Sequence, residues 1–364
     1  MALQIGIVGL PNVGKSTLFN ALTKTQGAAV ANYPFCTIDP NVGVVEVQDH
    51  RLHELARVSK SEKVVPAIVE FVDIAGLVKG ASTGEGLGNQ FLSHIRNVDA
   101  IVEVVRCFED DNVLHVHGQV HPQNDVEIIE AELIIADLDT VDKRIPNVEK
   151  KTRAGDKDAV KEVEMLAALK AHLEQGKIAH SFEVADDVLP AFKELHLLTA
   201  KPFLYGLNLS EAQVRSITPD ALKAFLPKVD PKLLVPISAQ IEAELVGLDE
   251  TDAKEFLKDL NLERSTLQGL VEQAYTLLGL QSYFTSGEKE SRAWTIHQGD
   301  TAPKAAGVIH TDFEKGFIKA DVVDWKDFVE LGGWSAAREK GKVRMEGKEY
   351  VMREGDTVLF KFNV

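Results

Sequence analysis

Apolar residues in the first third of the chain form short runs that alternate with polar and glycine-rich segments. Four of these runs are Ile5–Val8, Val42–Val47, Ile68–Asp73 and Ala100–Arg106. Runs of β-branched and aliphatic residues bounded by turn residues predict strands. Their alternation with helical patterns, such as the one over 16–22, predicts an α/β sheet covered by helices.

The pattern changes between about residues 125 and 200, where glycine is scarce and the strand runs disappear. Apolar residues here recur at spacings of three and four, as do Ile134, Leu138, Val141, Ile145, Val148, Val163, Leu166, Leu169 and Leu173. With a turn-like break over 151–157, this spacing predicts two long antiparallel helices that resemble a coiled coil. An ordinary pair of globular helices would show the same spacing. Pro146 should kink or end the first helix.

Strand runs return at Phe203–Asn208 and Leu233–Ser238, with helical patterns over 211–225, 239–245, 252–260 and 265–277. The helical hairpin therefore interrupts the α/β domain. A third pattern begins near residue 281, with strands predicted over 292–296, 317–323, 342–346, 349–352 and 357–363 and one short helix over 302–309. We predict an α/β domain over 1–124 and 201–280, an inserted hairpin over 125–200 and a small α+β domain over 281–364.

Composition places the chain among ordinary globular proteins, since 45% of its 364 residues are hydrophobic and 26% are charged. No apolar stretch reaches membrane-spanning length, so we expect no membrane partner. The N-terminus runs directly into the first strand, which is unlike a secretory signal. The two cysteines, Cys36 and Cys107, form no disulfide framework, and we predict a cytoplasmic protein.

The formal net charge of −16 opposes a general nucleic-acid coat, and we expect no specific DNA partner. One segment differs, because Lys143–Lys161 carries seven basic residues against three acidic ones, a net of +4. This cluster lies at the expected hairpin tip and could contact the phosphates of RNA or of the ribosome. A solvated helix end would carry a similar cluster.

The segment from Gly9 to Ser16 reads G-L-P-N-V-G-K-S, a complete phosphate-binding loop between a strand and a helix. In such loops backbone N–H groups surround the phosphates, the lysine reaches the outer phosphates and the serine hydroxyl ligates Mg²⁺. We expect nucleotide contacts from Asn12, Val13, Gly14, Lys15, Ser16 and Thr17. The fold class is therefore a P-loop, Ras-like nucleoside-triphosphate-binding domain.

Three further positions complete the expected phosphate site. Asp73 closes a strand in a D-x-x-G motif and could hold Mg²⁺, and Gly76 could offer its N–H to the γ-phosphate. Thr37, in the connecting loop, is the expected second hydroxyl ligand of Mg²⁺. The predicted metal ligands are thus Ser16, Thr37 and Asp73, and the predicted catalytic set is Lys15, Thr37, Asp73, Gly76 and Leu77.

Leu77 occupies the position at which Ras-like proteins carry the glutamine that orients the attacking water. Because leucine has no donor or acceptor, hydrolysis should be slow or another group should position the water. His115 is a candidate for that role, although a solvent-facing loop histidine is the simpler interpretation. The glycine-rich segment over 80–88 is interpreted as switch II.

Base recognition is expected in the segment Asn208-Leu209-Ser210-Glu211, after a late strand. A guanine site would have N-K-x-D, whose aspartate binds the N1–H and the amine of guanine. Here Leu209 replaces the lysine and Glu211 the aspartate, so the sequence favours ATP, with adenine meeting backbone groups and the Asn208 amide. Ser238 is expected to lie in the second loop beside the base.

The motifs at 9–23, 32–38 and 73–89 resemble those of Obg-related GTPases, and N-L-S-E at 208–211 resembles the YchF/Obg-like ATPase subfamily. The segments at 310–318 and 360–364 resemble the TGS module of that subfamily, a ubiquitin-like β-grasp. This resemblance implies a P-loop domain interrupted by a hairpin, then a TGS domain, with ATP preferred over GTP. It also implies that Asn12 could bind an activating K⁺, unless it only shapes the loop.

These observations favour a slow ATPase, with weaker GTPase activity, that switches conformation with its nucleotide and acts with the ribosome or translation machinery. Two alternatives remain. One is a nucleotide-gated adaptor for RNA or the ribosome in which hydrolysis is incidental, with contacts through the hairpin tip or the TGS domain. The other is a translation-associated GTPase that prefers GTP.

Overall fold

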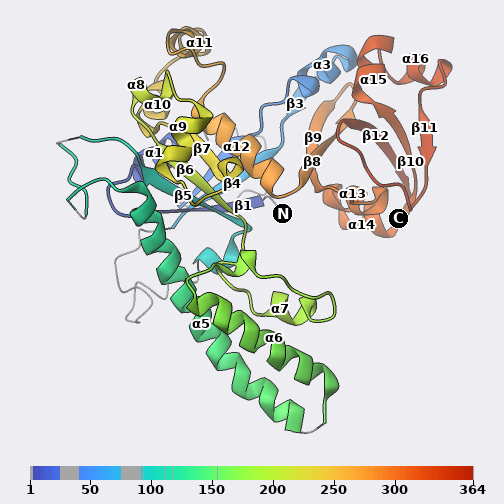
Figure 1. Cartoon of the computed structure of the whole chain (residues 1–364). Helices are drawn as coiled ribbons and strands as arrows, with labels where there is room; N and C mark the ends of the chain where they lie inside the picture. The colour runs from blue at the N-terminus through green and yellow to red at the C-terminus, as the bar shows by residue number, and fades with distance from the viewer. Residues whose placement is uncertain are drawn as a thin grey trace.

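The computed structural model describes residues 3–24, 41–74, 92, 94–110, 112–116, 118–153 and 155–363. A central α/β domain carries two projections, a helical hairpin below it and a C-terminal domain beside it (Figure 1). None of the helices in the described ranges is both long and apolar enough to cross a membrane.

The central domain is built on a six-stranded sheet with the order β2-β4-β1-β5-β6-β7. The strands are β1 (Leu3–Val8), β2 (Val42–Glu46), β4 (Ile68–Asp73), β5 (Ala100–Arg106), β6 (Phe203–Asn208) and β7 (Leu234–Ile237). Only β2 is antiparallel to its neighbour, β4. Every residue of β5 and of β6 is buried, as expected for parallel strands covered on both faces, and this explains their continuous apolar runs.

Helices cover this sheet, and the structure corrects one of the predictions. The helices with described bounds in this domain include α1 (Lys15–Lys24), α8 (Glu211–Val214), α9 (Pro219–Phe225), α10 (Ala239–Leu245), α11 (Glu250–Asp259) and α12 (Thr266–Leu277), with the 3-10 turn η4 (Pro231–Leu233). The single helix predicted over 211–225 is wrong, because α8 and α9 are separate. Pro219 has no N–H to continue a helix, and Thr218 caps α9 by accepting from the Ala221 N–H at 3.2 Å.

The predicted hairpin is present as α5 (Pro122–Arg153) and α6 (Lys157–Glu174), which pack against each other through buried apolar residues. Asp156 caps α6, because its carboxylate accepts from the N–H groups of Asp158 and Ala159. The returning chain contains η3 (Ala179–Ser181) and α7 (Leu189–Glu194). Of the two outcomes expected at Pro146, a kink or an end of the first helix, the end does not occur: α5 continues through the proline, since buried Val141 and Val148 on either side pack against α6.

The C-terminal domain contains a second six-stranded sheet with the order β11-β10-β12-β8-β9-β3. Its C-terminal strands are β8 (Leu280–Ser286), β9 (Glu290–His297), β10 (Phe317–Asp324), β11 (Arg344–Glu346) and β12 (Asp356–Phe362). Its short helices are α13 (Ala302–Ile309), α14 (Thr311–Lys315), α15 (Trp325–Leu331) and α16 (Trp334–Glu339), where one helix was predicted. The strand predicted over 349–352 is only an isolated bridge between Val351 and Thr301.

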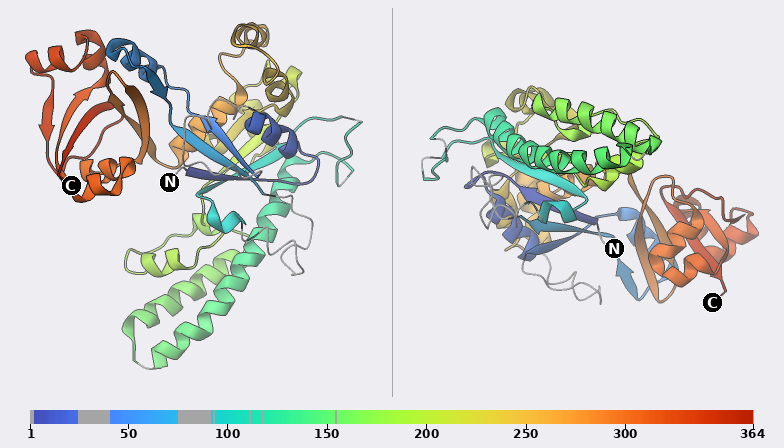
Figure 2. Two further views of the ribbon diagram at one scale, coloured as in Figure 1. Left: turned by 180° about the vertical axis from the view of Figure 1, so that it is seen from behind. Right: turned by 90° about the horizontal axis from the view of Figure 1, so that it is seen from below.

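An N-terminal segment completes this second sheet. Helix α3 (His50–Ser59) and strand β3 (Lys63–Val65) lie in sequence between β2 and β4, but β3 pairs in parallel with β9. Leu52 and Leu55 of α3 share a buried cluster with Phe284 and Phe328. Both views in Figure 2 show this segment reaching from the central sheet into the C-terminal domain. The sequence pattern did not predict this arrangement.

Candidate nucleotide-binding site

The phosphate-binding loop joins the end of β1 to the start of α1, at the carboxyl edge of the parallel strands. Gly9 has a φ angle of +148° and Gly14 one of +102°, values that residues with a side chain rarely adopt. A Cβ on Gly9 would lie 2.5 Å from the Val104 carbonyl oxygen, and one on Gly14 would lie 2.3 Å from Asn208 Nδ2. The two glycines therefore allow the loop to pack directly against β5 and β6.

Lys15 is the first residue of α1, and its side chain turns back over the loop. Its Nζ donates a hydrogen bond to the Leu10 carbonyl oxygen at 2.5 Å, and the residue is only 8% exposed. Burial lowers the pKa of Lys15 to about 8, although the carboxylates of Asp73 and Glu103 act in the opposite direction. The loop thus contains one buried cation whose charge is poorly solvated, which favours an anionic ligand.

Asp73 and Ser16 are the described residues that could hold Mg²⁺. Asp73 ends β4 and pairs in register with Ile7 of β1, next to the phosphate loop. Burial raises the pKa of its carboxyl group, and Lys15 lowers it in part. A carboxylate and an exposed hydroxyl beside a buried lysine fit the oxygen ligands that Mg²⁺ prefers. Thr37, Gly76 and Leu77, together with Cys36 and the glycine segment over 80–88, lie outside the described residues.

Asn208 links three parts of the site. Its Nδ2 donates to the Val13 carbonyl oxygen at 2.8 Å, and its Oδ1 accepts from the Ala239 N–H at 3.0 Å. The side chain is buried, so these bonds join the phosphate loop to the loops after β6 and β7. The expected contact of Asn208 with the base stays a prediction, and the two hydrogen bonds hold the side chain in place at this edge of the sheet.

The other expected base residues differ in their surroundings. Leu209 is 1% exposed and packs in the main core, so its side chain does not extend over the loop surface. Glu211 begins α8 and forms an ion pair with Arg215 at 2.6 Å. Ser238 is fully buried at the N-cap position of α10, but its Oγ makes no capping hydrogen bond and has no hydrogen-bond partner among the described residues.

The loop after β5 contacts the phosphate loop through Asn12. Asn12 has φ +62°, and its Nδ2 donates to the Leu114 carbonyl oxygen at 3.2 Å. The expectation of a solvent-facing His115 is wrong: its side chain is 3% exposed and lies 2.9 Å from the Asp125 carboxylate on α5. The histidine therefore joins this loop to the base of the hairpin.

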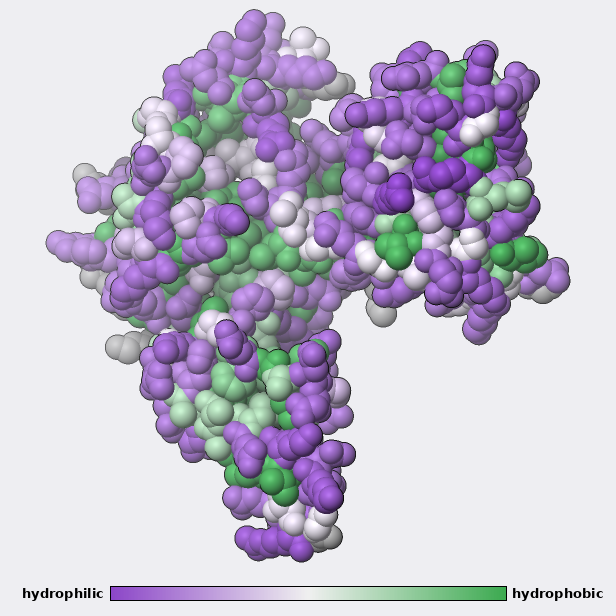
Figure 3. Space-filling model, turned by 45° about the vertical axis from the view of Figure 1, so that its right-hand side comes forward, coloured by the Kyte–Doolittle hydropathy of each residue, from purple (hydrophilic) through white to green (hydrophobic). Residues whose placement is uncertain are grey.

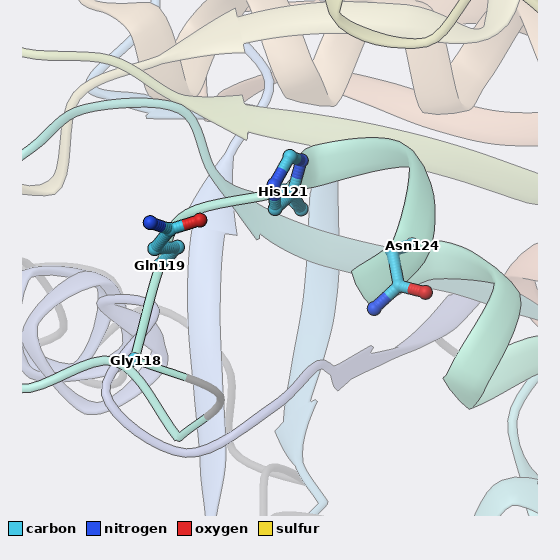
Figure 4. A pocket seen from close by; sticks show the side chains of 4 residues that line it. All are labelled: Gly118, Gln119, His121 and Asn124. Carbon is cyan, nitrogen blue, oxygen red and sulfur yellow. The ribbon is translucent and has the colours of Figure 1, made fainter.

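A hollow beside this loop was not predicted from the sequence. It has a volume of about 700 Å³ and is lined by Gly118, Gln119, His121 and Asn124 (Figure 4). These residues belong to the end of the loop and the first turn of α5. The sequence signal was only a glycine followed by polar residues, which is common to many loops.

The basic cluster of the hairpin divides into paired and unpaired residues. Lys143 pairs with Asp139, Arg144 with Glu162 and Glu194, and Lys161 with Asp187. In contrast, Lys150, Lys151, Arg153 and Lys157 make no ion pair within the described part of the chain. Hydrophilic residues cover the end of the hairpin in Figure 3. The unpaired cations are thus concentrated at its tip.

A mostly parallel sheet with a phosphate loop, a buried lysine and an adjacent aspartate at its carboxyl edge defines a P-loop nucleotide-binding protein. A family model described as a 50S ribosome-binding GTPase matches residues 4–150, and the YchF-GTPase C-terminal model, described as a protein of unknown function, matches 280–363. The chain belongs to the YchF family.

Relatives of known name cover the whole chain. The ribosome-binding ATPase YchF of Bacillus subtilis is 52% identical and that of Escherichia coli O157:H7 is 49% identical, each over 100% of both chains. The solved structure of the Schizosaccharomyces pombe YchF GTPase matches with a TM-score of 0.87 and 41% identity, over 99% of this chain and 97% of the other. The fold predicted from the sequence is confirmed.

Proposed function

We propose that this chain is a P-loop switch protein that binds ATP, hydrolyses it slowly and acts with the ribosome in the cytoplasm. GTP is a weaker ligand and substrate. The observation that carries the ATP assignment is the base loop, where buried Leu209 replaces the lysine of a guanine site and Glu211 is paired with Arg215. The names of the bacterial relatives, ribosome-binding ATPases, support the same assignment.

Lys15 and the loop amides bind the phosphates under this proposal, and Ser16, Thr37 and Asp73 hold Mg²⁺. The metal supplies charge neutralisation between the phosphates when it is bound. Gly76 donates to the γ-phosphate. Leu77 cannot orient water, which accounts for slow turnover. K⁺ is a further candidate activator, which we propose is bound through the Oδ1 of Asn12, while the Nδ2 of this residue donates to the Leu114 carbonyl oxygen.

The hairpin tip is the proposed ribosome or RNA contact. Four lysine and arginine side chains without an ion pair among the described residues project there from an acidic protein. Such cations can bind phosphates and release counterions. The TGS domain is the alternative contact surface.

The same unpaired cations also support a second candidate function. In this alternative the chain is a nucleotide-gated adaptor that binds RNA or the ribosome, and hydrolysis is incidental. Turnover of ATP measured with and without ribosomes separates the two. A switch ATPase should be stimulated by ribosomes, whereas an adaptor should bind them with unchanged turnover.

Lys15→Ala tests the site itself. Removing a cation from a dense anionic ligand should abolish hydrolysis and most triphosphate affinity. Lys24→Ala, at the far end of α1, is the matched control. Near-normal turnover in Lys15→Ala would refute the proposed site.

A further inference from the structure

Helix α8 follows the base loop directly and carries an internal ion pair. Glu211 Oε1 lies 2.6 Å from Arg215 Nη2, one turn further along the chain. Glu211 supplies the carboxylate of the four-residue loop 208–211, the group that takes the place of the guanine-binding aspartate. The ion pair with Arg215 therefore involves the side chain that would distinguish guanine from adenine.

The backbone of this loop is held by a second side chain of α8. Gln213 Oε1 accepts from the Ser210 N–H at 2.8 Å, and Gln213 Nε2 donates to the Cys107 carbonyl oxygen at 2.9 Å. The Ser210 hydroxyl in turn accepts from the Gln213 N–H, which completes a capping box. These bonds fix the loop to the end of β5, so Glu211 and Arg215 project from a defined backbone.

The two purines place opposite demands on a carboxylate. Guanine presents two adjacent donors, N1–H and the amine, and needs an acceptor that is free to receive both. Adenine presents an acceptor at N1 next to its amine, and a free carboxylate would face that acceptor unfavourably. A carboxylate with one oxygen bound to a guanidinium is partly neutralised, and that oxygen is no longer free to accept from the base.

We infer that Arg215 is a specificity-determining positioning residue, which withholds the Glu211 carboxylate from the base and so disfavours GTP. The inference rests on the proposed ATP preference. Under this inference Arg215, which lies outside the N-L-S-E segment, contributes to discrimination between ATP and GTP. Both side chains are partly exposed, at 45% for Arg215 and 35% for Glu211, so the pair can be removed without disturbing the core.

The test compares ATP and GTP affinities of Arg215→Gln, Glu211→Gln and the double variant, measured by calorimetry with Mg²⁺. Arg215→Gln should raise GTP affinity about three- to tenfold, the net range of one ordinary hydrogen bond, because the carboxylate is partly exposed, and change ATP affinity less than about twofold. The double variant should lose this gain. Arg57→Gln, which breaks an exposed Arg57–Glu54 pair on α3, is the matched control and should leave both affinities unchanged.

If Arg215→Gln leaves the ratio of GTP affinity to ATP affinity unchanged, the inference is wrong. A gain that persists in the double variant would also overturn it, because the effect would not act through Glu211. If instead the unmodified protein binds GTP as tightly as ATP, the proposed function itself is wrong. The ratio of the two affinities in the unmodified protein therefore distinguishes failure of the Arg215 inference from failure of the proposed function.

Discussion

Glu103 is a fully buried carboxyl group in the middle of β5, next to the phosphate-binding loop. It is 1% exposed, and its Oε2 has no hydrogen-bond partner in the part of the chain that is described. Burial raises its pKa well above the ordinary value of 4.5, and the nearby carboxylates of Glu130 and Asp125 add to the shift, while Lys15 opposes it. The folded protein therefore favours the protonated acid.

This shift predicts a pH-dependent stability. Because the folded-state pKa of Glu103 is raised, its stabilising contribution is complete below the unfolded pKa and is lost as pH rises towards the folded pKa. Glu103→Gln, which resembles the protonated acid, should be less sensitive to pH and more stable than the unmodified protein at pH 8. Urea unfolding at pH 5.5 and pH 8 measures this, with exposed Glu109→Gln as control. An equal loss of stability with pH in Glu103→Gln and the unmodified protein would contradict the assignment.

Asn208→Ala should weaken both the fold and ATP binding. The change leaves the Val13 carbonyl and the Ala239 N–H without their side-chain partner in a buried position. Each unsatisfied buried group costs about 1–3 kcal/mol, so with two such groups the free energy of unfolding should fall by about 2–6 kcal/mol. ATP affinity should fall with it, since the phosphate loop loses its link to β6. Asn147→Ala, which removes an exposed bond to Lys143 on the hairpin, should change neither quantity.

The residues of the site differ in how far sequence alone could describe them. The phosphate-loop motif predicts its own geometry, because its glycines, lysine and serine act locally. The burial of Leu209 and the pairing of Glu211 with Arg215 depend on the tertiary surroundings of α8, which no local pattern contains. For the same reason Leu209→Lys, which would give this loop the lysine of a guanine site, would place an ammonium group in the core.

At the level of elements, the hairpin is where helical spacing predicted most. The spacing of apolar residues predicted both helices and the turn between them. Helix α5 continues through exposed Pro146 because the packing of α5 against α6 outweighs the hydrogen bond that the proline cannot form. The division of the tip into paired and unpaired cations needed the structure, since Glu194 and Asp187 reach the hairpin from the returning chain.

Charge reversal at the tip tests its proposed contact. Changing Lys150, Lys151 and Arg153 to Glu should weaken co-sedimentation with ribosomes, because each cation that meets a phosphate releases counterions. Binding by the unmodified protein should also decline as salt rises. ATP hydrolysis by the free protein should not change.

The control for this experiment reverses three lysines of the α/β domain, Lys232, Lys254 and Lys258, and so has the same net charge. Weakened binding in the control to the same extent would mean that net charge, not the tip, is responsible. Binding that survives both the tip reversal and moderate salt would indicate that the contact lies in the C-terminal domain.

At the level of the whole molecule, the chain between β2 and β4 joins its two sheets. Helix α3 and strand β3 belong to the C-terminal domain by packing and pairing, although they precede Asp73 in sequence. Composition could not predict this, because β3 is short and its partner β9 follows more than 200 residues later. The six strands of the central domain, in contrast, could be predicted from local apolar runs and turn residues.

Phe328→Ala tests this connection. Phe328 is fully buried in the cluster that includes Leu52 and Leu55, and truncating such a side chain costs about 3–5 kcal/mol. Amide hydrogen exchange should increase in α3 as well as in α15. Phe317→Ala, in the other core cluster of the same domain, is the control and should affect α3 much less. Unchanged exchange in α3 after Phe328→Ala would show that α3 does not depend on the C-terminal core.

The central claim is that this P-loop site prefers adenine, and its most direct test is calorimetric titration of the unmodified full-length protein with ATP and with GTP in the same Mg²⁺ and K⁺ buffer. Buried Leu209 and the Glu211–Arg215 pair predict that ATP binds more tightly than GTP. GTP binding that is equal to or tighter than ATP binding would contradict the account.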